Sequence, residues 1–133
     1  MSFLTILAFS LAAVLAGFIA LQLFMVRRMR RLRGQQAPRL DGAAGRRVAD
    51  GRMALFYFYS PQCGACRSMT PVVRELAERV PGVFLVDVSQ DLETARRFKV
   101  MATPTTILVR DGKVAEVLVG ARSADTLRGL VGG

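Results

Sequence analysis

The sequence contains no histidine and no tryptophan, and only two of its 133 residues are cysteines. The absence of histidine excludes acid–base catalysis by an imidazole and every metal site that needs an imidazole ligand. The two cysteines, Cys63 and Cys66, are separated by two residues. They are therefore the residues on which a reactive centre is expected to depend.

Charged residues are absent from residues 1–26, and the positive charge of the chain is unevenly placed. Residues 27–52 hold nine arginines and two aspartates, a net charge of +7, whereas residues 53–133 carry only +2. A nucleic-acid-binding domain would spread its basic residues over a folded face, with aromatic or groove-reading elements among them. The charge pattern therefore predicts no nucleic-acid partner.

The uncharged N-terminal stretch is long enough to cross a membrane. Residues 3–26 number 24, and as a helix they would span roughly 36 Å, against about 30 Å for a bilayer core. A cleaved signal peptide would have a charged start, a shorter apolar core and a small-residue cleavage site. We therefore predict a retained single-pass anchor over residues 1–26, which contacts lipid through residues 3–26.

Five arginines directly after this stretch predict its orientation. Basic residues that flank a membrane span stay on the cytoplasmic side, so the rest of the chain is predicted to be cytoplasmic. The periplasmic face is the alternative. The segment 27–33 is also expected to contact anionic lipid headgroups.

The region between the anchor and the folded part is predicted to be a linker. Residues 34–52 are rich in turn-forming residues and show no apolar periodicity. We predict a basic juxtamembrane linker over residues 27–52, which acts as a tether without a catalytic role, followed by one domain over residues 53–133.

The order of predicted elements in this domain is β-α-β-α-β-β-α. Residues 53–59 are all apolar or aromatic, which favours a strand buried on both faces. An Asp-Gly pair at residues 111–112 predicts a hairpin, and Pro71 predicts a kink in the first helix. The remaining elements are expected over residues 63–80, 83–88, 91–98, 105–110 and 113–119, with a final helix capped by Ser123.

This order predicts an α/β fold behind a transmembrane helix. Right-handed crossover makes the first two strands parallel neighbours, and the hairpin adds two antiparallel strands. The expected result is a four-stranded mixed sheet of order 2-1-3-4, with helices on both faces.

The pair Cys63 and Cys66 lies at the first strand-to-helix junction, which is typical of a redox site. Two alternatives stay open at this point. A structural disulfide closing so short a loop would restrict the unfolded chain little. A zinc site needs four ligands, so two copies of the chain would have to share their cysteines.

Several motifs together carry a resemblance to a known family. The sequence from Cys63 to Arg67, Cys-Gly-Ala-Cys-Arg, is followed by Pro71. Residues 102–105 read Ala-Thr-Pro-Thr, and residues 111–113 read Asp-Gly-Lys. Over residues 53–133 this pattern resembles the thioredoxin family in a minimal form, since no strand or helix is expected between residue 34 and the first strand.

The resemblance implies roles for individual residues. Cys63, at the start of a helix where thiol pKa values are lowered, is expected to be the attacking nucleophile, and Cys66 the resolving thiol. A cis proline at Pro104 is expected opposite the cysteines. The implied substrate contacts are Ala102, Thr103 and Pro104, and the implied supporting residues are Gly64, Ala65 and Pro71.

Two positions depart from the family pattern. Gln62 stands where a tryptophan usually precedes the first cysteine, and Tyr57 stands where a buried acidic residue is usual. The resemblance still implies disulfide exchange with protein substrates, sustained by an electron-donor reductase, without an organic cofactor or a metal. The alternative is a binding or assembly module of the same fold that has no turnover.

Overall fold

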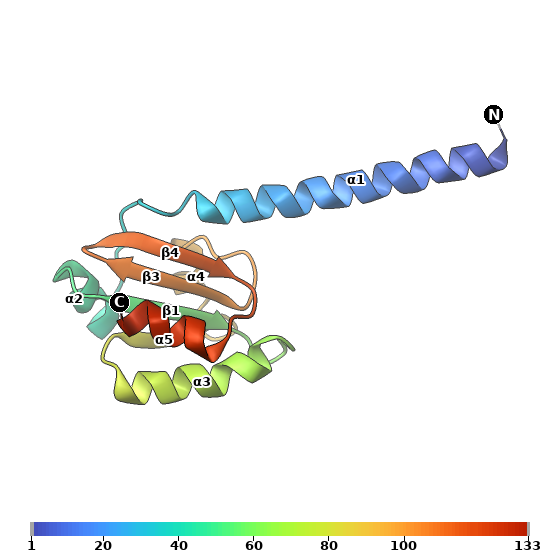
Figure 1. The fold of residues 1–133 in the computed structure, drawn as a ribbon. Helices are drawn as coiled ribbons and strands as arrows, with labels where there is room; N and C mark the ends of the chain where they lie inside the picture. Colours follow the sequence, from blue (N-terminus) through green and yellow to red (C-terminus); the bar gives the residue numbers. More distant parts are fainter. Residues whose placement is uncertain (1, 133) are drawn as a thin grey trace.

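The computed structural model of the protein describes residues 2–132. A long helix precedes a domain built around one sheet (Figure 1). In chain order the elements are α1 (Phe3–Arg30), α2 (Gly42–Ala49), β1 (Ala54–Tyr59), α3 (Cys66–Arg79), β2 (Val83–Asp87), α4 (Leu92–Arg97), β3 (Thr105–Arg110), β4 (Lys113–Val119) and α5 (Ala124–Gly132).

The four strands form one mixed sheet of order β2-β1-β3-β4, which confirms the predicted order. β1 pairs in parallel with β2, where Leu55 lies opposite Val83, and antiparallel with β3, where Phe58 lies opposite Thr105. β3 and β4 form the antiparallel hairpin that the Asp-Gly pair predicted. The carboxyl end of β1 and the amino end of β3 therefore lie at the same edge of the sheet.

The sheet separates two apolar cores, and alternate residues of β1 point into each. Phe56 and Phe58 pack with Phe98, at the end of α4, and with Val48 of α2 on one face. On the other face, Tyr57 and its neighbours pack against α3 and α5. Residues 54–58 are all buried, as expected for a strand covered on both sides.

The last helix begins where the sequence predicted. The backbone N–H of Thr126 donates to the Ser123 hydroxyl at 3.3 Å, so Ser123 caps α5. Leu127 is the buried residue of α5 and packs in the same core as Tyr57. Pro71 lies inside α3, on its exposed side.

The prediction that residues 34–52 form a linker without a helix is wrong. The helix α2 lies within this stretch, and its Val48 is buried against the sheet. Ahead of α2, the chain runs along β4: Gly34 N–H donates to the Val114 carbonyl at 2.7 Å, and Ala37 N–H donates to the Gly112 carbonyl at 2.9 Å. α2 has eight residues and one large apolar side chain, too short a stretch for hydrophobic periodicity to show.

The helix α1 begins as expected but extends past the predicted anchor. Its apolar side chains are exposed from Phe3 to Phe24, and it is the one helix among the described residues long and apolar enough to cross a membrane. Near its end, Met29 is only 2% exposed and belongs to the core of the domain. The segment after residue 26 is therefore part of the folded structure.

The cap of α4 gives a testable dependence of stability on pH. Asp91 accepts hydrogen bonds from the Thr94 hydroxyl (2.7 Å) and the Thr94 N–H (3.1 Å), and these bonds lower the pKa of Asp91 below its usual value. The stabilisation is present at neutral pH and is lost as pH falls through the lowered pKa. We expect Asp91→Ala to reduce the free energy of unfolding by about 1 kcal/mol at neutral pH.

Urea unfolding of the full chain in detergent at several pH values measures this deficit, which should disappear in acid. Asp91→Asn is the matched control, because the amide still caps the helix but does not titrate. A deficit for Asp91→Ala that is the same at every pH would contradict the assignment.

Candidate active site

The two cysteines lie in the turn that joins β1 to α3. Cys63 donates its backbone N–H to the Ser60 carbonyl at 3.2 Å, which closes the turn. Cys66 is the first residue of α3. The two sulfurs form a disulfide, with the Cα atoms 5.3 Å apart.

The two cysteine residues are unequally exposed. Cys66 is only 2% exposed, whereas Cys63 is partly exposed and Gly64 and Ala65 beside it are exposed. The backbone N–H of Cys66 donates to Cys63 Sγ at 3.2 Å. The Cys63 sulfur thus accepts one of the N–H groups that have no partner within the helix, where negative charge is stabilised.

The loop of residues 101–104 lies at the same edge of the sheet. Because Phe58 of β1 pairs with Thr105 of β3, the residues just before Thr105 lie beside the end of β1. The Thr103–Pro104 peptide is cis, as the resemblance implied. Pro104 is buried, Thr103 is partly exposed and Ala102 is exposed.

A third loop, after β4, completes this edge. The Gly120 N–H donates to the Pro104 carbonyl at 2.8 Å, and the Arg122 N–H donates to Met69 Sδ at 3.3 Å. Met69 lies one turn beyond Cys66 on α3. We call the edge formed by residues 60–66, 101–104 and 120–122 the redox edge.

Tyr57 makes a hydrogen-bond network beneath the cysteines that the sequence did not reveal. Its hydroxyl donates to the Cys66 carbonyl at 3.3 Å and lies 3.0 Å from the Thr70 hydroxyl. Thr70 also donates to the Cys66 carbonyl, at 2.8 Å. The only signal for this network was general: a buried tyrosine hydroxyl needs a partner, and Thr70 follows Cys66 by one helical turn.

The environment of Tyr57 keeps its phenol protonated. Burial removes the hydroxyl from water and raises the pKa of Tyr57, an effect that the hydrogen bond to Thr70 only partly offsets. A neutral phenol therefore stands at the position where the family usually carries an acid. It binds the backbone of Cys66 and adds no negative charge near the sulfurs.

A cavity of about 340 Å³ opens beside the cysteines. Both sulfur-bearing residues line it, together with Pro71, Arg67, Arg74 and Asp87 among others. The resemblance implies Pro71 as a supporting residue, whereas no sequence pattern points to Arg74 or Asp87. Ala102, Thr103 and Pro104 are not among its lining residues, so the structure places them at the same edge but outside this cavity.

No described residues form a group of three or more histidine, cysteine or acidic side chains that could hold a metal ion. Within the chain, the two cysteine sulfurs are bonded to each other. The chemistry that this arrangement can perform is the opening and closing of that disulfide.

The fold and the site support a class of protein, the thiol–disulfide oxidoreductases. An accessible sulfur at a helix N-terminus next to a buried one is the arrangement that disulfide exchange requires. The family model described as thioredoxin matches residues 45–132, which is more than half of the chain. The protein belongs to the thioredoxin family.

Individual relatives agree with this assignment. A thioredoxin H-type from Oryza sativa subsp. indica is 42% identical over 77 residues, which cover 56% of this chain and 63% of that protein. The thioredoxin of Bacillus subtilis is 35% identical over 77 residues and is covered to 74%. The chain thus spans less than two thirds of the rice relative and about three quarters of the bacterial one.

Solved structures show the same fold. The X-ray structure of Fasciola hepatica thioredoxin has a TM-score of 0.53 and is 36% identical. The match covers 62% of this chain and 80% of the Fasciola chain. A mutant thioredoxin from Halobacterium salinarum has a TM-score of 0.58 and is 30% identical. The match covers 74% of this chain and 93% of the Halobacterium chain.

The network under Cys66 is tested by removing one hydroxyl. Tyr57→Phe keeps the ring but removes a buried hydrogen bond, so we expect a loss of about 1 kcal/mol in the free energy of unfolding of the oxidised protein. Tyr59→Phe, which removes the same group from a half-buried ring nearby, should cost clearly less. Equal losses in denaturant unfolding would show that the Tyr57 hydroxyl has no special role.

Proposed function

We propose that the protein is a membrane-tethered thiol–disulfide oxidoreductase that reduces disulfides in protein substrates. The observation that carries this proposal is the asymmetry of the cysteine pair: Cys63 is accessible at the N-terminus of α3, and Cys66 is buried behind it. The thioredoxin family model over residues 45–132 supports the same activity.

The reaction transfers two electrons from the cysteine pair to the substrate. The Cys63 thiolate attacks one sulfur of the substrate disulfide, which forms a mixed disulfide and releases the other substrate sulfur as a thiolate that takes up a proton. Cys66 then loses its proton to solvent and attacks Cys63 Sγ. The second substrate thiol is released, and the Cys63–Cys66 disulfide is formed.

The arrangement around the pair supports this division of roles. Gly64 and Ala65 leave the Cys63 sulfur unobstructed, and the N–H of Cys66 that donates to this sulfur favours its thiolate. The loop of Ala102, Thr103 and Pro104 is proposed to contact the substrate chain. A dithiol reductase that serves as electron donor would restore the reduced pair, and no bound organic cofactor is needed.

The exchange reaction is tested by insulin reduction with the full chain in detergent. We expect Cys63→Ser to lower the rate to the level of the chemical reductant alone, and Cys66→Ser to accumulate the mixed disulfide. Ser68→Ala, an exposed change on the same turn of α3, should keep the parent rate. Equal activity of the parent and Cys63→Ser would contradict the proposed reaction, because the exchange would then not depend on Cys63. Inactivity of both would also contradict it and would favour a binding module without turnover.

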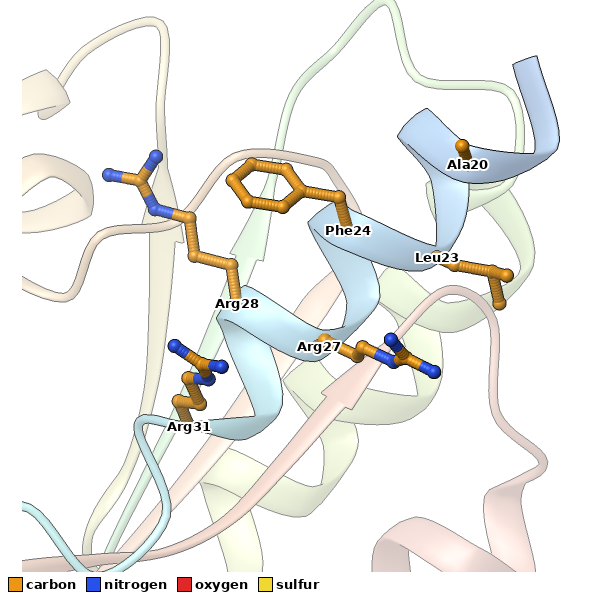
Figure 2. A pocket seen from close by; sticks show the side chains of 6 residues that line it. All are labelled: Ala20, Leu23, Phe24, Arg27, Arg28 and Arg31. Carbon is orange, nitrogen blue, oxygen red and sulfur yellow. The ribbon is translucent and has the colours of Figure 1, made fainter. Parts of the chain in front are cut away.

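The membrane assignment rests on α1 and its surroundings. Figure 2 shows the aliphatic and aromatic side chains of Leu23 and Phe24 followed, within about two helical turns, by those of Arg27, Arg28 and Arg31. Arginines that directly follow a long apolar stretch are typical of the end of a membrane span. We place this boundary close to Phe24, with lipid acyl chains along residues 3–26 and anionic headgroups beside the arginines.

The arginines also give an orientation that fusions can test. Since basic flanks stay in the cytoplasm, we expect a C-terminal fluorescent protein that matures only inside the cell to be bright, and a C-terminal phosphatase that is active only outside to be inactive. Changing the five arginines of segment 27–33 to lysine should leave this pattern intact. An active phosphatase on the parent chain would place the domain on the periplasmic face.

A further inference from the structure

The end of the helix α1 is packed against the domain. Met29 is buried in the core of the domain, and Arg33 forms an ion pair with Glu116 of β4. Gly34, four residues after the end of α1, already donates its N–H to the sheet. So short a connection, fixed on both sides, gives the domain little freedom to turn relative to α1.

The direction of α1 relative to the sheet follows from its contacts with β4. Gly34 lies beside Val114, near the amino end of β4, and Arg33 pairs with Glu116 further along the strand. Val26 then lines a groove together with Val119 and Arg122, at and beyond the carboxyl end of β4. The helix α1, followed from Arg30 back toward its N-terminus, therefore runs in the same direction as β4 followed toward its carboxyl end.

The carboxyl end of β4 belongs to the redox edge. Gly120 is bonded to Pro104, and Arg122 is bonded to Met69, one turn of α3 beyond Cys66. Figure 1 shows the same relation: α1 extends toward the side of the domain on which α3 begins. Val26, the last residue of the apolar stretch, thus lies at the level of the edge that holds the cysteines.

The composition of this edge fits a position at the membrane surface. The groove that Val26 lines contains Arg30 and Arg122, and cations near a membrane surface are attracted to anionic headgroups. Outside α1, the large apolar side chains that are exposed among the described residues are those of Leu92 and Met101. Met101, 45% exposed, lies in the loop of the redox edge.

We propose that the redox edge faces the bilayer, and that the substrates are disulfides held at the membrane surface by other membrane-bound proteins. This inference rests on the proposed function for its chemistry, and on the docking of α1 for its geometry. A partner protein anchored in the same bilayer can present a disulfide close to the membrane surface, where Cys63 is proposed to lie. A disulfide far from the membrane would lie on the side of the domain opposite the redox edge and could not contact Cys63.

The geometry is tested first, without any use of activity. The full chain is placed in liposomes that contain lipids with a nitroxide on the headgroup, and a fluorophore is attached to Cys63 in the variant Cys66→Ser. The matched control carries the same fluorophore on the exposed position of Glu78→Cys, with both native cysteines changed to serine. Glu78 lies 12 residues further along α3, or about 18 Å from Cys66 along the helix axis.

We expect the fluorophore on Cys63 to be quenched strongly by the headgroup nitroxides, and the one at position 78 weakly. Equal quenching, or stronger quenching at position 78, would overturn the proposed orientation whatever the enzyme does in solution.

The substrate class is tested by a disulfide peptide attached to the vesicle lipid through a short or a long flexible spacer. A redox edge that faces the bilayer should reduce the short-spacer peptide at least as fast as the long-spacer one. A preference for the long spacer would contradict the proposal, because the site would then face away from the membrane. Failure of the proposed function would be distinct, since neither peptide nor insulin would then be reduced, in vesicles or in detergent.

Discussion

The burial of β1 on both faces is the constraint on which the rest of the structure depends. Its side chains alternate between two cores, so every other element must pack on one side or the other of this strand. The strand also ends at a fixed place, and the turn that follows brings Cys63 to the surface and Cys66 to the start of α3. The pairing of β1 with β3 then brings residues 101–104 to the same edge. Core packing and site geometry are thus consequences of one strand.

Tyr57 shows how the core extends into the site. It lies in the middle of β1, and its hydroxyl reaches the carbonyl of Cys66 and the hydroxyl of Thr70. A carboxylate at this position would add a group that accepts protons close to Cys66, whereas the buried phenol keeps its proton. The cavity beside the cysteines is lined by both Cys66 and Asp87, so the carboxylate in these surroundings lies on β2 and not at position 57.

Local patterns were enough to predict most of the domain. The apolar run of β1, the Asp-Gly hairpin and the cap at Ser123 each depend on neighbouring residues, and all three are found in the structure. Handedness of the crossover then limited the sheet to the order that is observed. The structure of the stretch 34–52 has the opposite origin, so the sequence does not predict it. Its order comes from contacts with β4 and with the core, through residues such as Gly34 and Val48, and such long-range contacts leave no periodic trace.

The sequence by itself determined the type of fold, the pair Cys63 and Cys66 as its reactive centre, and an apolar stretch long enough to span a membrane. These follow from spacing, hydrophobicity and chain connectivity, which are properties of consecutive residues. Only the tertiary structure decided that Tyr57 binds the backbone of Cys66, and that Met29 and Arg33 fix α1 against the sheet. Both depend on residues distant in the chain meeting across a packed core. For that reason the position of α1 relative to the redox edge follows from packing, and not from any motif.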